Sequence, residues 1–371
     1  MTFSAAGWKE ASLGEICTFK YGKSLPQTIR KGGDFSVYGS NGVVGQHDAA
    51  ITTGQTIVIG RKGSYGEINY SRGPCWPIDT AYFVDETSTQ QDIKWLSYRL
   101  ASLGLNQLNK AAAVPGLNRE DAYRQLLLVP PLPVQRRIAA ILDQTDVLRA
   151  KRQEALAQLD KLTNSLFQFV FGAPAEAEQR YELVRLGDVT RFIDYRGISP
   201  NKQASGVRLV TARNIKRGWF EENPKEFIPA EEYVAWMRRG MPRTGDILFT
   251  TEGHTLGSAA KLPYFEKVAL AQRLIALQPN ENLASDYLLH IVLSREFQQE
   301  IVRRATGSAA KGISSKQLAM VMLPLPPMTL QQTFARQIQI IGQLKAVQIA
   351  ELQTLDSLFA SLQHRAFRGE L

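Results

Sequence analysis

Cysteine and histidine are scarce in this chain, which has 371 residues but only two cysteines and four histidines. Cys17 and Cys75 form no CxxC motif, so the sequence supports neither a disulfide framework nor a structural zinc site. Long apolar runs are also absent, since none reaches the roughly 18 residues that a membrane span needs. The first residues lack the charged and apolar regions of a signal peptide. These absences predict a cytoplasmic protein with no membrane contact.

Catalytic motifs are incomplete wherever they begin. The VPPL segment at 129–132 resembles the Asn/Asp-Pro-Pro-aromatic motif of amino-methyltransferases, but Val and Leu can neither accept a hydrogen bond from the target amino group nor stack on a flipped base. The GKS segment at 22–24 lacks the upstream glycine of a phosphate-binding loop. Asp79, Asp92 and Lys94 have the spacing of a nuclease motif, but Asp92 and Lys94 begin a predicted helix. The sequence therefore predicts no catalytic residue, no metal site and no cofactor.

Positive charge exceeds negative charge in both halves of the chain. The net charge is +9 and the sequence pI is about 9.5. Residues 1–172 carry +4 of this charge and residues 173–371 carry +5. Because neutralised phosphates release counterions, this balance suits a polyanion that is contacted at two places. The alternative is a basic protein without such a partner.

The second half of the chain repeats the first. When each residue is paired with the residue 196 positions later, identical residues recur from Gly116 and Gly312 to Phe171 and Phe367. Chance seldom keeps one register over so long a stretch, so a duplicated structural unit is predicted.

Each unit begins with a segment that has the pattern of a mixed α/β domain, which we call the head. In the first head, residues 56–60 are typical of a strand and are followed by the glycine-containing loop 61–66. Residues 92–102 have the apolar spacing of a helix, and Asn118 is expected to cap another.

The second head shows the same order. Residues 246–251 predict a strand, and the loop 252–257 follows it. Residues 285–294 predict a helix, on which His290 is expected to pack rather than to act in catalysis, and Ser314 is the expected cap of the next helix.

Each head leads through a proline-rich segment into a long amphipathic helix. The apolar residues recur with a 3.5-residue period, which is typical of a coiled coil. The two helices are predicted to pair antiparallel with pseudo-twofold symmetry, and a parallel or intermolecular coil is the alternative. Arg149 and Lys345 are expected to face outward, toward partners or solvent. The residues predicted to join the helices are Ile138, Ile141, Leu148, Leu159, Leu162, Leu166, Phe334, Ile341, Leu344, Leu355, Leu358 and Leu362.

The predicted fold class is therefore α+β, with two tandem mixed α/β heads that are each followed by a long helix. The expected boundaries are 1–131 for the first head, 132–172 for its helix, 173–183 for a linker, 184–325 for the second head and 326–371 for its helix.

This order resembles that of the specificity subunits of type I restriction-modification systems, and the resemblance covers essentially the whole chain. It rests on LPVQRRIAAIL (132–142), MTLQQTFARQI (328–338), TGDILFTTEGHTLG (244–257) and LAQRLIAL (270–277). Each motif is weak alone, but their order and duplication are specific.

The resemblance implies a DNA-binding role without catalysis. Each head would be a target-recognition domain that reads one half of a bipartite, asymmetric site in double-stranded DNA. The helices would set the unread gap and dock two modification (methyltransferase) subunits and the restriction/translocase subunits. S-adenosylmethionine, ATP and Mg would belong to those partner subunits. The alternatives are a coiled-coil scaffold without sequence-specific DNA binding and a self-contained methyltransferase.

Base and phosphate recognition needs polar or cationic side chains on loops, because arginine pairs with guanine, amides pair with adenine and lysine pairs with phosphate. In the first head the candidates are Lys20, Tyr21, Lys23, Ser40, Asn41, Arg61, Lys62, Ser64 and Tyr65. In the second head they are Arg196, Arg213, Asn214, Lys216, Arg217, Thr251, His254 and Lys311.

Overall fold

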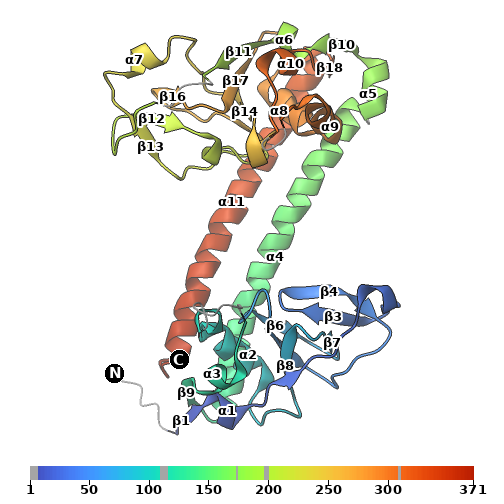
Figure 1. Ribbon diagram of the computed structural model, residues 1–371, viewed down its shortest axis with the longest axis vertical. Coiled ribbons are helices and arrows are strands. Elements are labelled where there is room, and N and C mark those ends of the chain that lie inside the picture. Colours follow the sequence, from blue (N-terminus) through green and yellow to red (C-terminus); the bar gives the residue numbers. More distant parts are fainter. Residues whose placement is uncertain (1–6, 109–115, 173, 196–199, 308–310) are drawn as a thin grey trace. The chain divides into compact units, whose positions relative to one another are not determined.

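The chain folds into two compact units in the computed structural model, which describes residues 7–108, 116–172, 174–195, 200–307 and 311–371 (Figure 1). Unit 1 comprises Met1–Glu154 and Gln348–Leu371, and unit 2 comprises Ala155–Val347. The two long helices are α4 (Leu132–Phe171) and α11 (Met328–Ala366), and each contributes one part to each unit.

The described residues of the head of unit 1 form three small sheets. A four-stranded antiparallel sheet has the order β2-β8-β5-β6, a three-stranded sheet has the order β4-β3-β7, and β1 pairs with β9. The strands are β1 (Lys9–Ser12), β2 (Lys20–Tyr21), β3 (Phe35–Gly39), β4 (Gly42–His47), β5 (Thr56–Gly60), β6 (Ile68–Ser71), β7 (Trp76–Pro77), β8 (Ala81–Asp85) and β9 (Leu126–Val129). The helices are α1 (Leu13–Ile16), α2 (Ile93–Ser102) and α3 (Arg119–Tyr123), with 3-10 turns η1 (Gln27–Ile29) and η2 (Leu105–Gln107).

The head of unit 2 repeats this arrangement sheet by sheet. Its four-stranded sheet has the order β11-β17-β14-β15, its three-stranded sheet has the order β13-β12-β16, and β10 pairs with β18. The strands are β10 (Glu182–Arg185), β11 (Thr190–Asp194), β12 (Val207–Val210), β13 (Glu226–Ile228), β14 (Ile247–Thr250), β15 (Ala259–Lys261), β16 (Val268–Leu270), β17 (Leu274–Pro279) and β18 (Met322–Leu325). The helices are α5 (Pro174–Arg180), α6 (Leu186–Val189), α7 (Tyr233–Trp236), α8 (Ser285–Leu293), α9 (Arg295–Arg304) and α10 (Ser315–Ala319), with 3-10 turns η3 (Ala212–Asn214) and η4 (Gly253–Thr255).

The shared strand order confirms the predicted fold class of two tandem mixed α/β heads. The strand predicted at 56–60 is β5, and the helix predicted at 92–102 is α2. Asn118 and Ser314 cap α3 and α10, as the sequence predicts. The segment predicted as the linker contains α5 and the start of β10.

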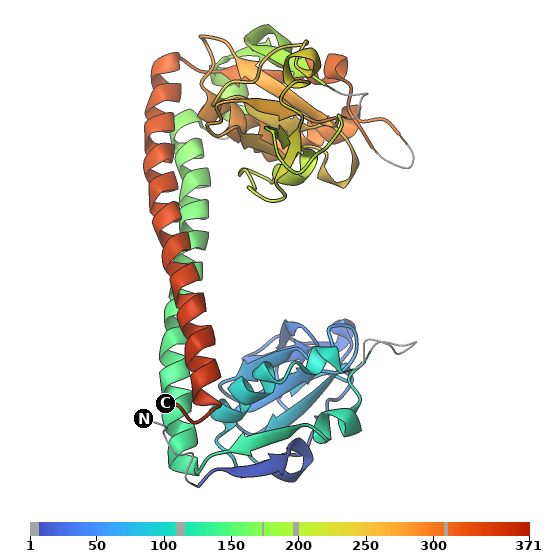
Figure 2. The ribbon, with the colours of Figure 1, turned by 90° about the vertical axis from the view of Figure 1, so that its left-hand side faces the viewer.

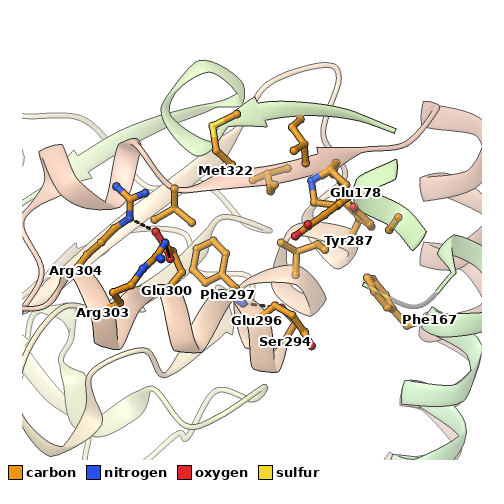
Figure 3. Close-up of a pocket in the computed structure, with 16 residues that line it drawn as sticks. Phe167, Glu178, Tyr287, Ser294, Glu296, Phe297, Glu300, Arg303, Arg304 and Met322 are labelled. Atoms are coloured by element: carbon orange, nitrogen blue, oxygen red, sulfur yellow. Dashed lines mark hydrogen bonds and ion pairs between the residues drawn. The ribbon is translucent and has the colours of Figure 1, made fainter. Parts of the chain in front are cut away.

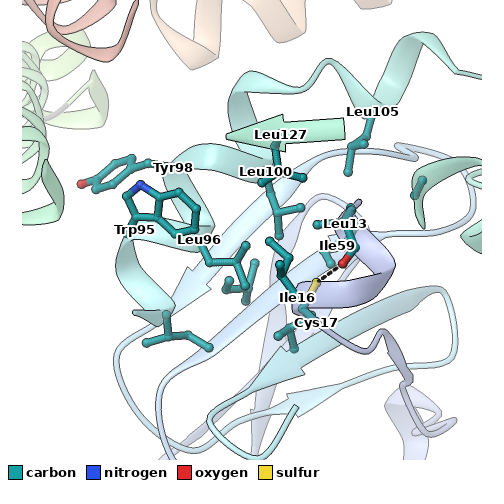
Figure 4. Close-up of a cluster of buried hydrophobic side chains, with 14 of the residues drawn as sticks. Leu13, Ile16, Cys17, Ile59, Trp95, Leu96, Tyr98, Leu100, Leu105 and Leu127 are labelled. Atoms are coloured by element: carbon teal, nitrogen blue, oxygen red, sulfur yellow. Dashed lines mark hydrogen bonds between the residues drawn. The ribbon is translucent and has the colours of Figure 1, made fainter. Parts of the chain in front are cut away.

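The core of unit 1 lies between α2 and the four-stranded sheet (Figure 4). Trp95, Leu96 and Leu100 of α2 are buried there with Ile57 and Ile59 of β5. β5 reads TIVIG, and all five of its residues are buried, which explains its β-branched composition. The same core includes Leu142 of α4 and Ala366 of α11, so both long helices complete it.

The core of unit 2 is completed by aromatic rings from the long helices. Phe171 of α4 packs edge-on against Tyr287 of α8 at 4.7 Å and against Phe334 of α11 at 5.3 Å between ring centroids. His290 packs against Phe167 and Phe334, with centroids 5.4 and 5.0 Å apart, which confirms the packing role predicted for it.

Within unit 1, the first part of α4 and the last part of α11 lie side by side in both views (Figures 1 and 2). Arg149 Nε lies 2.6 Å from Asp356 Oδ1, and Arg152 Nη1 lies 3.2 Å from Glu351 Oε2. As residue numbers rise along α4, those of the partners fall along α11, so the two segments are antiparallel as predicted.

Within unit 2, the last part of α4 and the first part of α11 pair in the same way. Lys345 Nζ lies 2.6 Å from Asp160 Oδ1, and Phe167 packs on Phe334 with ring centroids 5.5 Å apart. Lys345 and Asp160 are the repeat equivalents of Arg149 and Asp356, so equivalent ion pairs join the helices within each unit.

The structure corrects alternate positions of the predicted helix seam. Leu148, Leu162, Leu344 and Leu358 are 47%, 50%, 49% and 46% exposed, whereas the seam passes through the following residue in each case. Counting from Ile138, the spacing between successive inward-facing residues is first four and then three, whereas the sequence predicted first three and then four. Arg149 and Lys345, which the sequence placed outward, therefore occupy seam positions and are neutralised by carboxylates of the other helix. Ile138, Phe334 and Ile341 are buried, and Ile141, Leu159, Leu166, Leu355 and Leu362 are partly buried.

A buried glutamine joins each head to its long helix. Gln135 of α4 is 1% exposed, accepts a hydrogen bond from the Asp92 amide at the start of α2, and donates to the Pro130 carbonyl, both at 2.8 Å. Its repeat equivalent Gln331 of α11 is fully buried, accepts from the Ala284 amide and donates to the Pro326 carbonyl, again at 2.8 Å. The amide side chain fixes the head helix to the proline-rich entry of the long helix.

Two further expectations concern cysteine and membranes. Cys17 and Cys75 are buried and not joined in a disulfide. Of the helices in the described parts of the chain, none is long and apolar enough to cross a membrane.

Candidate nucleic-acid interface

In the first head, three loop groups converge on one carbonyl beside the end of β5. The Thr80 carbonyl accepts hydrogen bonds from the Arg61 amide at 2.9 Å, the Lys62 amide at 3.1 Å and the Ser40 hydroxyl at 2.6 Å. The Leu117 amide donates to the Arg61 carbonyl at 2.9 Å. The loop that follows β5 is therefore held by segments from three places in the head.

The second head builds the same frame with different side chains. The Arg273 carbonyl accepts from the Thr251 amide at 3.1 Å and from the Thr251 hydroxyl at 3.3 Å. The Ile313 amide donates to the Thr251 carbonyl at 2.9 Å, and the Gly253 amide donates to the Lys311 carbonyl at 3.0 Å. Arg273 thus stands where Thr80 stands in the first head. We call this place the loop corner of each head.

A glycine permits the close backbone approach at each loop corner. Gly116 pairs with Lys62 in an isolated bridge, and a Cβ on Gly116 would lie 3.1 Å from the Arg61 carbonyl oxygen. Gly312 pairs with Glu252, and its Cβ would lie 3.3 Å from the Glu252 side chain. The loop corner therefore accounts for the matched glycines of the sequence repeat.

Aromatic rings hold the guanidinium of Arg61 at the first loop corner. Its Cζ lies 5.2 Å from the ring centroid of Tyr21 and 5.8 Å from that of Tyr82. The guanidinium of Arg119 also lies over the Tyr21 ring, with its Cζ 5.6 Å from the ring centroid. Burial raises the pKa of Tyr82, so the cation faces a neutral phenol. Tyr21 is 53% exposed, so this cluster borders solvent.

The Arg61 guanidinium is not neutralised by any carboxylate in the part of the chain that the structure describes. Among the residues that the structure describes, it forms no ion pair, and its Nε is buried without a hydrogen-bond acceptor. An arginine that is stacked but not neutralised keeps its outer N–H groups for a ligand with paired acceptors, such as a guanine edge or a phosphate.

The other predicted residues of the first head divide by environment. Lys20 binds Asp85 at 3.1 Å and Thr87 at 2.6 Å, so its charge is used within the fold. Tyr65 packs against the core. Ser40 supports the loop corner through Thr80. The exposed candidates are Lys23, Asn41, Lys62 and Ser64.

In the second head, two predicted residues are inside the fold. Asn214 is fully buried, donates to the Glu221 and Pro224 carbonyls at 2.9 and 3.0 Å, and accepts from Thr211. Thr251 is 1% exposed and supports the loop corner. Neither side chain is available to DNA at the surface.

The remaining predicted residues of the second head are more accessible. Arg213 lies 3.7 Å from Glu226, and Arg217 donates to the Leu293 carbonyl at 3.1 Å. Arg196 lies outside the described residues. His254 and Lys311 are exposed beside the loop corner, and Lys216 is partly buried.

Sequence reasoning missed two cations at the loop corners, Arg119 and Arg273. Arg119 is the first residue of α3, where it was masked by the capping pattern of Asn118. Arg273 lies within LAQRLIAL, which carries the family resemblance but gives no local sign that the chain turns there.

A cavity of about 340 Å³ lies in unit 2 between α8, α9 and β18, and the residues that line it include Tyr287 and Phe297 (Figure 3) as well as Leu323. Burial alone would raise the pKa of Glu300 at its rim, but Arg304 and Arg303 lower that pKa overall. A carboxylate held ionised by two arginines is a poor general base. The described residues contain no group of three or more His, Cys, Asp or Glu side chains that could hold a metal ion.

Comparison with known proteins assigns the repeated heads to a family. The family model for "Type I restriction modification DNA specificity domain" matches residues 6–158 and 178–354. The chain belongs to this family. The two matches coincide with the two repeats, so each repeat is one specificity domain.

The proteins with similar sequences include specificity subunits of type I restriction enzymes. The chain is 20% identical to the type I restriction enzyme MjaVIII specificity subunit of Methanocaldococcus jannaschii over 297 residues, which are 74% of this chain and 69% of that protein. It is 30% identical to the EcoprrI specificity subunit of Escherichia coli over 146 residues, 38% of this chain and 36% of that one.

A solved structure supports the fold. The S subunit of the type I restriction-modification system from M. genitalium is similar with a TM-score of 0.65 and 15% identity, over 99% of this chain and 98% of that chain. This likeness supports the fold of the chain.

Proposed function

We propose that the chain is the DNA sequence-specificity subunit of a type I restriction-modification complex, in which each head reads one half of a bipartite, asymmetric site. The observation that carries this proposal is the loop corner, which both heads build from equivalent main-chain contacts but furnish with different side chains. Equal frames with unequal side chains suit two half-sites of different sequence. Arg61 at the first loop corner, which forms no ion pair with any residue that the structure describes, supplies donors for one half-site.

The paired helices would set the length of the unread gap. α4 has 40 residues and α11 has 39, so at 1.5 Å per residue each is about 60 Å long. Main-chain hydrogen bonds make such a helix stiff along its axis, and the duplex rises about 34 Å per turn. A stiff spacer of this length would fix how many base pairs separate two contacted grooves.

Partner subunits would dock on the outer faces of these helices. Leu148 and Leu358 in unit 1, and their repeat equivalents Leu344 and Leu162 in unit 2, are each about half exposed. A surface that occurs twice suits two copies of one partner, and we assign it to two modification (methyltransferase) subunits. Restriction/translocase subunits complete the assembly in the cytoplasm. S-adenosylmethionine, ATP and Mg are assigned to those partners, and this chain to a non-catalytic role.

The test removes one heptad from each helix at equivalent positions, residues 150–156 and 346–352. This double deletion brings Arg149 and Lys345 closer along the helices but keeps both opposite their carboxylates, because equal lengths leave the antiparallel register intact. About 10 Å of helix is lost, which corresponds to about three base pairs. Methylation-aware sequencing of DNA from cells that contain the partner subunits should show a two-part motif with a shorter gap and unchanged half-sites.

Three results would overturn parts of this proposal. An unchanged gap would reject the spacer role. Binding of the intact complex to duplex DNA without any sequence preference would favour a coiled-coil scaffold. Methyl transfer by the purified chain alone would restore a self-contained methyltransferase.

A further inference from the structure

Arg273 has a backbone conformation that L-amino acids seldom adopt. Its φ is +74°, and among the described residues it is the only one besides glycine with positive φ. Glycine takes this conformation without a Cβ penalty and is the default choice there. Arginine at such a position indicates that the side chain serves a purpose that a glycine could not serve.

The conformation of Arg273 is fixed from both sides. Its carbonyl is held by the Thr251 amide and hydroxyl at the loop corner. Its Nε lies 2.8 Å from Glu252 Oε1, and Glu252 is itself paired with Gly312. The Arg273 side chain is nevertheless 59% exposed. One edge of the guanidinium is therefore anchored, while its outer Nη groups remain at the surface.

The two heads supply an arginine to the same corner from different segments. In the first head the guanidinium comes from Arg61, at the start of the loop after β5, and Thr80 contributes to the frame only through its carbonyl oxygen, which accepts hydrogen bonds. In the second head the equivalent loop residue is the buried Thr251, and the arginine is Arg273, at the entry to β17.

We propose that Arg273 determines specificity by reading a guanine in the half-site of the second head. The outer N–H groups of arginine match the O6 and N7 acceptors of guanine in the major groove, and this pairing needs a guanidinium of fixed orientation. The contact to Glu252 provides that orientation. This inference rests on the proposed DNA-reading function and deepens it for one residue.

The test compares Arg273→Gly and Arg273→Lys in the full chain with its partner subunits. Motifs are read by methylation-aware sequencing of a randomised DNA library in the same cells. For Arg273→Gly we expect preference for one guanine of the second half-site to fall about tenfold or more, with the first half-site unchanged. The thermal midpoint should stay equal or rise, because glycine relieves the backbone. A merely structural arginine would lower it.

Arg273→Lys separates base from phosphate contact, because lysine keeps the charge but loses the paired donors. We expect the guanine preference to be lost in this variant too. The matched control is Arg243→Ala. Arg243 is an exposed arginine of the same head that precedes β14, whereas the loop corner follows β14, so this variant should leave the motif unchanged.

Three outcomes would reject the inference: retention of the guanine by either variant, uniform weakening at every position, or a second half-site without a conserved guanine in the wild-type motif. A wild type without any two-part motif would instead reject the proposed function itself.

Discussion

Arg149 of α4 and Asp356 of α11 form an ion pair whose Nε and Oδ1 atoms are 2.6 Å apart, and their repeat equivalents Lys345 and Asp160 form another at 2.6 Å. Arg152 lies between Arg149 and Asp160 on α4, and it donates a hydrogen bond to Gln348 of α11 at 3.0 Å. Arg152 and Gln348 occupy the same position in the two copies of the sequence repeat. Polar contacts at repeat-related seam positions specify one antiparallel register, as polar residues do in other coiled coils.

Charge reversal tests this register. Arg149→Asp would face Asp356 and Asp146, and we expect it to lower the free energy of unfolding by about 1 kcal/mol, since both groups are partly exposed and screened. Adding Asp356→Arg should recover about half of this loss, measured by urea unfolding as a double-mutant cycle. Lys345→Asp with Asp160→Lys is the matched pair. Strict additivity in both cycles would contradict the role of these contacts.

We expect the buried glutamines Gln135 and Gln331 to stabilise the fold, so replacing either with an apolar residue should lower stability. Gln135→Leu and Gln331→Leu leave a backbone amide and a proline carbonyl without partners, and we expect each to cost about 2 kcal/mol of stability. Thermal unfolding measures this loss. The neighbouring exposed Gln332→Leu is the control, and it should change stability by less than about 0.5 kcal/mol. Equal losses of stability in Gln331→Leu and Gln332→Leu would contradict the role of the buried glutamine in joining the head to the long helix.

Arg61→Ala should impair reading by the first head alone. We expect a loss of about 1–3 kcal/mol in binding to the native site, with relaxed preference at one base pair and an unchanged second half-site. Binding of the complete complex to duplexes that vary at each position measures this. Lys9→Ala, an exposed cation of β1 in the same unit, is the control. Equal weakening on all duplexes would mean that Arg61 contacts phosphate.

Acid should destabilise unit 2 through His290. Burial lowers the pKa of this histidine to about 4, whereas the unfolded chain has a value near 6.5. The unfolded chain therefore takes up a proton first, and the stabilising contribution is complete above pH 6.5 and is lost as the pH falls toward 4. Between pH 7 and pH 5 the loss is on the order of 2 kcal/mol.

The measurement is urea unfolding at both pH values for the wild type and for His290→Phe, which fits the ring contacts with Phe167 and Phe334. The variant should lose less stability on acidification. If both proteins respond alike, His290 does not carry the pH dependence.

Local patterns predicted much of this fold. β5 and α2 were evident from β-branched content and helical spacing, and the capping residues Asn118 and Ser314 mark helix starts in the sequence as they do in the structure. These features depend on neighbours within a few residues, so a single sequence contains them.

Features that depend on distant partners were not evident. The seam was predicted one residue early at Leu148 and Leu344, because the acids that neutralise Arg149 and Lys345 lie on the other helix. Asn214 has a side-chain amide of the kind that pairs with adenine. The chain folds back at Pro224, however, and the carbonyl of Pro224 accepts a hydrogen bond from this amide. The positive φ of Arg273 had no sequence sign, because the residue is not glycine.

The loop corners have an evolutionary consequence. The carbonyls of Thr80 and Arg273, and most of the groups that bind them, belong to the main chain and are present whatever amino acid occupies the position. Point substitutions in these loops can therefore alter which bases are favoured without disturbing the scaffold beneath. Divergence within a lineage of such proteins can thus proceed by single codons while the main-chain contacts of both loop corners are retained.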